Sequence, residues 1–292
     1  MTQGAGPEGA AWPAPAKLNL MLRILGRRPD GYHRLQTVFQ FIDRQDRLWF
    51  DLREDGQIRR LTPIPGVPEQ QDLTVRAARA LQQATGCRLG VEIRVEKVLP
   101  LGGGLGGGSS DAATTLIALN RLWGLNLDQD ALARLGLALG ADVPVFVRGL
   151  AAWGEGVGER LTPVTLPEPW YLVLVPPCQV STGAVFGHPK LTRDSLAVKL
   201  EDFLSGDRTN DCLPVVRAGY APVAAALDWL SGQGQARLTG TGACCFAEFG
   251  DHRSALAALG RVPPGFEGFL ARGLNRSPLL DRLADGESAR PG

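Results

Sequence analysis

Six of the seven residues from Gly102 to Gly108 are glycine, and no other feature of the sequence limits the possible folds as strongly. An alternating segment at 91–98 predicts a strand before the cluster, and an apolar segment at 109–123 predicts a helix after it. Glycines allow positive φ and bring backbone N–H groups close to a ligand, while the helix adds about half a positive charge at its N-terminus. The cluster therefore predicts a phosphate-binding loop, because a flexible linker has no reason to lead directly into an apolar helix.

Two known nucleotide-binding patterns almost fit this loop. Gly102, Gly104 and Gly107 satisfy G-x-G-x-x-G, and Asp128 lies at a suitable distance for a ribose carboxylate, but Asp128 has the position of a helix N-cap. A dinucleotide dehydrogenase therefore stays only an alternative. The pattern G-x-x-x-x-G-K-[ST] would place its lysine at Gly108, which excludes an ordinary Walker loop and requires the cation to come from another segment.

A second strand carries a lysine that could supply this cation. Residues 16–24 alternate between apolar and polar side chains, which predicts a strand with one buried face. Lys17 and Asn19 lie on its polar face, about 6.6 Å apart by strand rise, and point in the same direction. They form either a solvated edge or part of the binding site.

Three further short segments carry residues with catalytic or binding chemistry. Asp142 follows a predicted helix and precedes an apolar run, so it is either a turn-forming residue or a general base. The segment Asp-Gly-Tyr-His at 30–33 predicts a turn with an aromatic cover, or a binding turn. The glycine-rich segment 239–244 predicts a tight connection between strands or a ligand contact.

The composition predicts a globular protein and gives no reason to expect that its surface as a whole binds a polyanion. The net charge of +1 gives no reason to expect nucleic acid. The five cysteines show no C-x-x-C spacing, which favours thiols in a reducing compartment over a structural zinc site. No basic residue precedes Lys17 and no apolar run reaches about 18 residues, so we expect a cytoplasmic protein with neither a signal peptide nor a membrane partner.

The order of the predicted elements indicates an α+β fold, because strands and helices are segregated along the chain. At about 150 residues per domain, 292 residues suggest two domains, and a Gly/Glu-rich stretch at 154–159 predicts a boundary between 1–158 and 159–292. One predicted helix is framed by Asp72 and Gly86. The other predicted helices are 128–139, 193–204, 221–230 and 253–259, and the other predicted strands are 46–52, 57–61, 170–175, 237–239, 244–249 and 266–271.

Five motifs, taken in order, resemble those of the GHMP small-molecule kinase superfamily over about residues 14–249. They are Pro-Ala-Lys-Leu-Asn-Leu at 15–20, the segment 26–33 that ends in Asp-Gly-Tyr-His, the glycine loop 102–111, Gly-Ala-Asp-Val-Pro at 140–144 and Gly-Thr-Gly-Ala-Cys at 240–244. The resemblance implies a two-domain α+β fold. Its N-terminal domain would be like ribosomal protein S5 domain 2, its C-terminal domain would be ferredoxin-like, and the substrate cleft would lie between them.

The same resemblance implies a reaction and a set of site residues. The reaction is transfer of the γ-phosphate of ATP to a hydroxyl of a cytidine diphosphate-linked polyol, with Asp142 as the catalytic aspartate and Lys17 as its partner. Tyr32 and Phe186 would enclose the cytosine, and His33 would form a hydrogen bond with it. Asn19 and Thr182 complete the implied substrate contacts. The residues expected to bind ATP are Gly102, Gly103, Gly104, Leu105, Gly106, Gly107, Gly108, Ser109 and Ser110.

The resemblance leaves the Mg²⁺ ligands unassigned. Related kinases often use a loop serine with a glutamate, and no acidic residue of this sequence clearly matches that glutamate. Another kinase of the superfamily and a nucleotide-binding sensor without turnover are the alternatives. The presence of both Lys17 and Asp142 argues against the sensor. The sequence does not predict an oligomeric state.

Overall fold

The computed structural model describes residues 10–288 and has the predicted α+β character. The strands are β1 (Trp12–Arg27), β2 (His33–Arg53), β3 (Ile58–Arg60), β4 (Gly90–Glu96), β5 (Ala152–Gly156), β6 (Arg160–Pro163), β7 (Trp170–Val175), β8 (Arg237–Leu238), β9 (Cys245–Phe249) and β10 (Glu267–Leu274). The helices are the 3₁₀ turn η1 (Glu69–Gln71), α1 (Leu73–Thr85), α2 (Gly107–Leu122), α3 (Gln129–Leu139), α4 (Val143–Arg148), α5 (Thr182–Gly187), α6 (Leu200–Leu204), α7 (Leu213–Gly219), α8 (Ala221–Ser231), α9 (His252–Leu259) and α10 (Pro278–Ser288).

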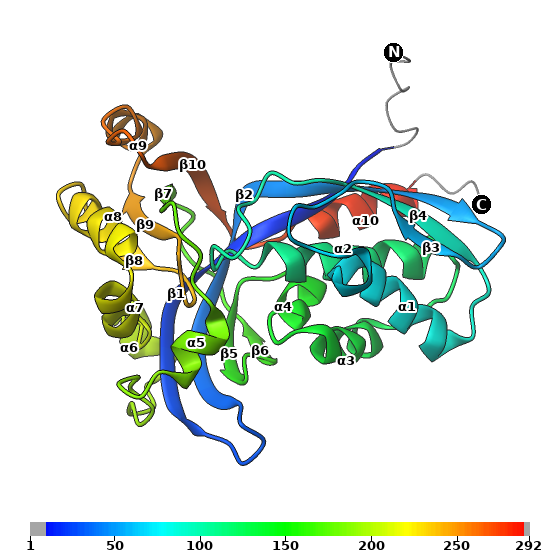
Figure 1. Ribbon diagram of the computed structural model, residues 1–292, viewed down its shortest axis with the longest axis horizontal. Coiled ribbons are helices and arrows are strands. Elements are labelled where there is room, and N and C mark those ends of the chain that lie inside the picture. The colour runs from blue at the N-terminus through cyan, green and yellow to red at the C-terminus, as the bar shows by residue number, and fades with distance from the viewer. Residues whose placement is uncertain (1–9, 289–292) are drawn as a thin grey trace.

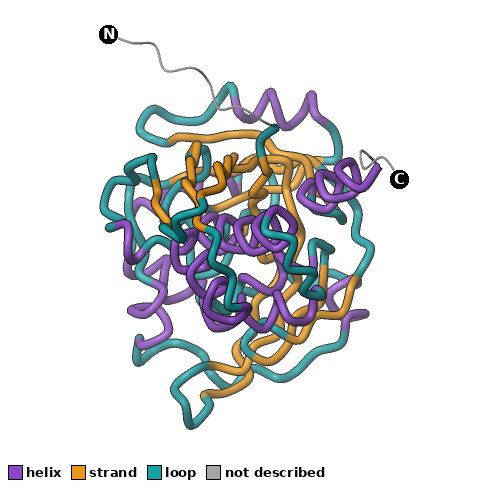
Figure 2. The backbone as a smooth tube through the Cα atoms, turned by 90° about the vertical axis from the view of Figure 1, so that its right-hand side faces the viewer, coloured by secondary structure: helices purple, strands orange, loops and turns teal. Residues whose placement is uncertain are grey.

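The strand β2 organises the sheet. It pairs antiparallel with β1, β4, β5 and β10, and the sheet continues from β10 through β7 and β9 to β8. In Figure 1, β1 and β2 extend through the molecule, with α1–α4 and α10 on one side and α7–α9 beside β7–β10 on the other. Figure 2 shows the chain turned by 90° about the vertical axis, with strands and helices intermixed in this direction of view. The β1–β2 hairpin therefore belongs to both halves of the fold.

Buried apolar residues form three clusters, and β1 contributes to each of them. Trp12 packs in the first cluster, with helices α1–α4. Leu22 packs in the second, with α5, α7 and α8. Leu18 packs in the third, together with Leu105 of the glycine loop and Phe246 of β9. This third cluster lies directly beneath the loop and fixes its position relative to β1.

Of the two alternatives left open for the polar face of β1, the solvated edge is wrong. Lys17 and Asn19 are only 2% and 4% exposed. The glycine loop covers this face, since the Lys17 N–H donates to the Leu105 carbonyl over 3.0 Å, and the Asn19 N–H donates to the Thr239 hydroxyl over 3.0 Å. The alternation at 16–24 marks a face buried under another segment, and a period of two cannot distinguish this from exposure to water.

The predicted helix 193–204 is also mostly wrong, because only α6 is helical there. Tertiary hydrogen bonds occupy the backbone before it. The Ser195 N–H donates to the Ile24 carbonyl over 3.1 Å, and the Val198 N–H donates to the Gln36 side chain over 2.9 Å. These donors are bound to β1 and β2, so the segment does not form a helical ladder. The sequence analysis also missed η1, α4, α5, α7, α10, β5, β6 and the part of β2 before residue 46.

The helix ends were predicted more accurately. The Asp72 side chain accepts the Thr74 N–H at the start of α1, and Gly86 ends that helix with φ +68°. The Asp128 side chain accepts the Ala131 N–H over 2.7 Å, which confirms it as the N-cap of α3. The predicted domain boundary falls within the β5–β6 hairpin, and the division at 158/159 stays a prediction. None of the helices within residues 10–288 is long and apolar enough to span a membrane.

A buried charge cluster joins β2, the segment after β4, and α2. The Lys97 ammonium binds the Asp46 carboxylate and lies 2.8 Å from the Asp111 carboxylate. Asp46 also accepts the two backbone N–H groups that follow Lys97, over 2.6 and 2.8 Å. Burial raises the pKa of Asp111 to about 7 against the attraction of Lys97, and the Asp46 carboxylate adds to the rise. The second Asp111 oxygen is buried without a hydrogen-bond partner.

We predict that Asp111→Asn flattens the pH dependence of stability between pH 5 and 8. The folded-state pKa of Asp111 lies above its unfolded value of about 3.9, so the unfolded chain loses the proton first and the free energy of unfolding falls as pH rises. At about 1.4 kcal/mol per pKa unit, the wild type should lose about 1–3 kcal/mol relative to the variant across this range. Urea denaturation at several pH values measures the difference. Equal slopes in both proteins would contradict the prediction, and Asp130→Asn, at an exposed position, serves as the control.

Candidate active site

A cavity of about 410 Å³ lies where β1, the glycine loop, the start of α4 and the 240–242 segment meet. Most of the predicted site residues line it, although they come from distant parts of the chain. They are Lys17, Asn19, Gly102, Gly103, Gly104, Gly106, Gly107, Gly108, Ser109, Asp142, Thr182 and Phe186. The structure therefore brings together in one place the residues predicted to bind phosphate, to catalyse the reaction and to contact part of the substrate.

The glycine loop requires its glycines for conformation and for space. Gly102, Gly104 and Gly106 have φ values of +70°, +77° and +76°. A Cβ atom at Gly104 would lie 2.3 Å from the Thr239 carbonyl oxygen, so the loop packs closely on the 239–242 segment. Gly106 is the N-cap of α2, and the first N–H groups of a helix have no intrahelical acceptor. The start of α2 at the cavity is therefore suited to an anion.

Two loop residues that were predicted to bind ATP, Leu105 and Ser110, do not line the cavity. The Leu105 side chain is buried in the third apolar cluster, and its carbonyl accepts the Lys17 N–H. Ser110 is completely buried, and its hydroxyl donates to the Pro15 carbonyl over 2.7 Å while its N–H donates to the Gly106 carbonyl. The helix begins at Gly107, two residues earlier than predicted. Leu105 and Ser110 thus attach the loop to β1.

The Lys17 ammonium is the centre of the polar network. Its Nζ lies 3.1 Å from the Asp142 Oδ2 and donates to the Asn19 Oδ1 over 2.5 Å and to the Gly104 carbonyl over 3.0 Å. The ammonium is buried, whereas the Asp142 side chain is 34% exposed. Three acceptors compensate the desolvation of the ammonium. A carboxylate open to the cavity beside a buried cation can accept a proton from a hydroxyl group.

Local structure explains why Asp142 faces Lys17. Asp142 occupies the N-cap position of α4, but its side chain makes no capping hydrogen bond, and Pro144 in the first turn has no N–H to offer. Asn19 holds the other side of the network, since its amide nitrogen donates to the Thr37 hydroxyl over 2.9 Å. The amide oxygen of Asn19 is thereby turned toward Lys17.

The sequence analysis left the role of 239–244 open and did not assign one to Lys97. Gly240, Thr241 and Gly242 line the cavity, and the Thr241 hydroxyl lies 3.0 Å from the Thr182 hydroxyl. Lys97 also lines the cavity, next to the start of α2. A lysine between the predicted strand and the glycine loop is a signal that could have been used.

The structure places His33 against Phe186, and the enclosure of the cytosine by Tyr32 and Phe186 stays a prediction. The rings of His33 and Phe186 stack, with centroids 5.0 Å apart and planes 28° apart. Tyr32 is 61% exposed, whereas His33 is buried, and neither of them lines the cavity. Burial lowers the pKa of His33, and the positive charges of Arg193 and Arg27 lower it further. His33 is therefore held as a neutral ring.

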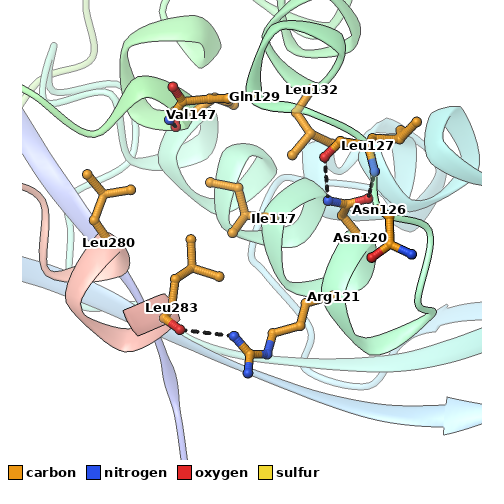
Figure 3. A pocket seen from close by; sticks show the side chains of 10 residues that line it. All are labelled: Ile117, Asn120, Arg121, Asn126, Leu127, Gln129, Leu132, Val147, Leu280 and Leu283. Carbon is orange, nitrogen blue, oxygen red and sulfur yellow. Dashed lines mark hydrogen bonds between the residues drawn. The ribbon is translucent and has the colours of Figure 1, made fainter. Parts of the chain in front are cut away.

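A second cavity, of about 390 Å³, lies between α2, α3 and α10 (Figure 3). Its polar side chains bind the backbone. Asn120 exchanges hydrogen bonds with Leu127, Gln129 donates to the Val147 carbonyl, and Arg121 donates to the Leu283 carbonyl. Its lining includes no carboxylate, hydroxyl, lysine or histidine side chain. This cavity lacks the groups that the first cavity offers for chemistry.

Comparison with known proteins gives consistent matches along the chain. The sequence matches the family models "GHMP kinases N terminal domain" at residues 72–150 and "GHMP kinases C terminal" at residues 195–264. The 4-diphosphocytidyl-2-C-methyl-D-erythritol kinase of Halorhodospira halophila (strain DSM 244 / SL1) is 56% identical over 288 residues, covering 98% of this chain and 99% of that protein.

Two further matches agree with these. The protein of the same name from Alkalilimnicola ehrlichii (strain ATCC BAA-1101 / DSM 17681 / MLHE-1) is 60% identical over 272 residues, covering 93% of this chain and 94% of that protein. A crystal structure of 4-(cytidine 5'-diphospho)-2C-methyl-D-erythritol kinase superposes with a TM-score of 0.77 at 31% identity, covering 90% of this chain and 99% of that chain.

We predict that Gly106→Ala weakens ATP binding by tenfold or more in a protein that still folds. The added Cβ would lie 2.7 Å from the Phe146 ring and 3.1 Å from the Lys17 Cε, so the start of α2 and the lysine must shift. Gly102→Ala is the matched control, because Gly102 has a similar φ of +70° but no atom within 4 Å of its added Cβ. Calorimetric titration with ATP measures both affinities. Equal losses would show that backbone strain alone is responsible.

Proposed function

This chain belongs to the GHMP kinase family, and from that premise we propose that it phosphorylates the 2-hydroxyl of 4-diphosphocytidyl-2-C-methyl-D-erythritol. The reaction belongs to the non-mevalonate route to isoprenoid precursors. The chain is an ATP-dependent small-molecule kinase. The observation that carries the proposal is the Lys17–Asp142 pair, 3.1 Å apart, in the same cavity as the N-terminus of α2.

The start of α2 is the proposed site of the ATP phosphates. Gly107, Gly108 and Ser109 line the cavity there, and their N–H groups belong to the first turn of the helix. These donors and the helix dipole favour a polyanion. The γ-phosphate would then lie near Lys17, which supplies the cation that a Walker lysine supplies in other nucleotide-binding loops.

Asp142 is the proposed general base. Its carboxylate takes the proton of the substrate hydroxyl as the hydroxyl oxygen bonds to the γ-phosphorus, and the bond between that phosphorus and the oxygen that bridges it to the β-phosphate breaks to release ADP. The Lys17 ammonium stabilises the negative charge that develops around the reacting oxygens. Asn19 orients Lys17 through the 2.5 Å hydrogen bond.

Magnesium is proposed to enter with ATP. Asp142 is the only carboxylate among the residues that line the cavity, and residues 10–288 contain no group of three or more His, Cys, Asp or Glu side chains arranged to hold a metal. Mg²⁺ commonly keeps several waters and binds through one or two carboxylates and the substrate phosphates. When bound, it neutralises charge on the phosphates. We assign it no further protein ligand.

The cytosine is proposed to bind at the Tyr32–His33 turn. Phe186 lines the cavity and already stacks on His33, so its ring is held in place for a base to pack against. The exposed Tyr32 ring would cover the opposite face of the base, and His33 would donate a hydrogen bond to its edge. Thr182, which lies beside Thr241 at the cavity, would contact the part of the substrate between the base and the reacting hydroxyl.

We predict that Asp142→Asn lowers kcat by about 10² or more and leaves ATP affinity almost unchanged. The amide keeps the size of the carboxylate but cannot accept the proton. Steady-state kinetics and calorimetry measure the two quantities, and the exposed Asp130→Asn is the control. Turnover within a few-fold of wild type would show that Asp142 is only a turn residue.

We also predict that Phe186→Ala weakens substrate binding by about ten- to a hundredfold, because stacking on one base contributes roughly 1–3 kcal/mol. The KM for ATP should stay constant. Removing the cytidine from the substrate should lower kcat/KM much less in this variant than in the wild type, because the contact between the base and Phe186 is already gone. The measurement is kcat/KM for both substrates with both proteins. Strictly additive losses would mean that Phe186 does not contact the base.

A further inference from the structure

One arginine connects the residues proposed to bind the cytosine. The Arg193 guanidinium donates from Nε to the His33 Nε2 over 3.2 Å. Its Nη2 donates to the Phe186 and His188 carbonyls over 2.7 and 2.8 Å, and its Nη1 donates to the Leu191 carbonyl over 3.1 Å. Four hydrogen bonds therefore tie the start of β2 to the end of α5 through one side chain.

These contacts determine which nitrogen of His33 carries the proton. A guanidinium has five N–H donors and no acceptor, and it stays protonated in proteins. The His33 Nε2 must therefore accept, which leaves it without a proton. In a neutral imidazole the proton then lies on Nδ1. Burial lowers the pKa of His33, and the charges of Arg193 and Arg27 lower it further, which favours this neutral form.

The orientation of the ring is fixed by the same residue. Arg193 binds the Phe186 carbonyl as well as the His33 ring, and the two rings stack at 5.0 Å. Within residues 10–288, Arg193 is the hydrogen-bond partner recorded for the His33 ring. The Nδ1–H group is then a single donor, held in a fixed direction, on the ring proposed to meet the base.

We propose that Arg193 is a positioning residue that holds His33 as a neutral Nδ1–H donor, and that this donor selects cytosine by binding its N3 acceptor. Uracil carries a hydrogen at N3, so the same donor would face another donor. A site that leaves a polar group unpaired rejects the analogue strongly. The proposal rests on the function proposed above, because it requires the base to bind at His33.

The test compares Arg193→Met and Arg193→Lys with Lys190→Met. Lys190 is an exposed residue on the same segment, so its substitution removes one positive charge without removing the contacts of Arg193. For Arg193→Met we expect a rise of about tenfold or more in the substrate KM, with kcat and the KM for ATP within a few-fold of wild type. Lysine cannot bind all four acceptors and should restore only part of the loss. Lys190→Met should behave as the wild type.

Imidazole ¹⁵N NMR reports the tautomer independently of activity. The wild type should show a protonated Nδ1 and an unprotonated Nε2 at pH 7. Arg193→Met should show mixed tautomers and a His33 pKa that rises toward the ordinary value of about 6.5.

Specificity and a double-mutant cycle complete the test. The preference for the cytidine substrate over its uridine analogue should shrink in Arg193→Met. In a His33→Ala background, Arg193→Met should add little to the substrate KM, because it acts through His33. Additive losses, or an unchanged tautomer in folded Arg193→Met, would overturn this proposal alone. A wild-type substrate KM in His33→Ala would instead overturn the proposed binding place of the base.

Discussion

The buried Lys17 ammonium is the interaction on which the site depends. It holds together three segments that are far apart in sequence, through the Asn19 side chain on β1, the Gly104 carbonyl in the glycine loop and the Asp142 carboxylate at the start of α4. A buried charge with one acceptor missing costs several kcal/mol, so each of the three segments must keep its place. Gly104 has a positive φ, and the Asp142 carboxylate makes no capping bond and so is available to the ammonium.

The features predicted correctly from sequence are those fixed by local chemistry. Asp72 and Asp128 cap their helices because a short carboxylate before an apolar helix satisfies orphan N–H groups. The glycine loop was recognisable because few other structures use so many glycines before a helix. Lys17 and Asp142 were selected by residue type and motif, and the structure places them together.

What the sequence could not predict depends on contacts between distant segments. The alternation in β1 gave no sign that the loop covers its polar face. Residues 193–199 were predicted as helix, although the Ser195 and Val198 N–H groups bind β1 and β2. The side chains of Ser109 and Ser110 have the same chemistry, yet only Ser109 lines the cavity, because the hydroxyl of Ser110 binds Pro15. The stacking of His33 on Phe186 likewise joins residues that are 153 positions apart in the sequence.

The β1–β2 hairpin also carries the proposed catalytic lysine and the proposed recognition turn on one continuous pair of strands. Lys17 pairs with Phe41 near the sheet centre, and Arg27 pairs with His33 at the other end, with three register shifts between Trp12 and Arg27. Side chains alternate between the two faces of a strand, so inserting one residue between Lys17 and the turn would place Lys17 and the turn residues on opposite faces. Inserting two residues would keep the faces but lengthen the distance between Lys17 and the turn by about 6.6 Å. The hairpin therefore acts as a molecular ruler. Under the proposed function, its residue count sets the length of substrate that can reach both the proposed base-binding turn and Lys17, so we expect this hairpin to tolerate changes of sequence better than changes of length.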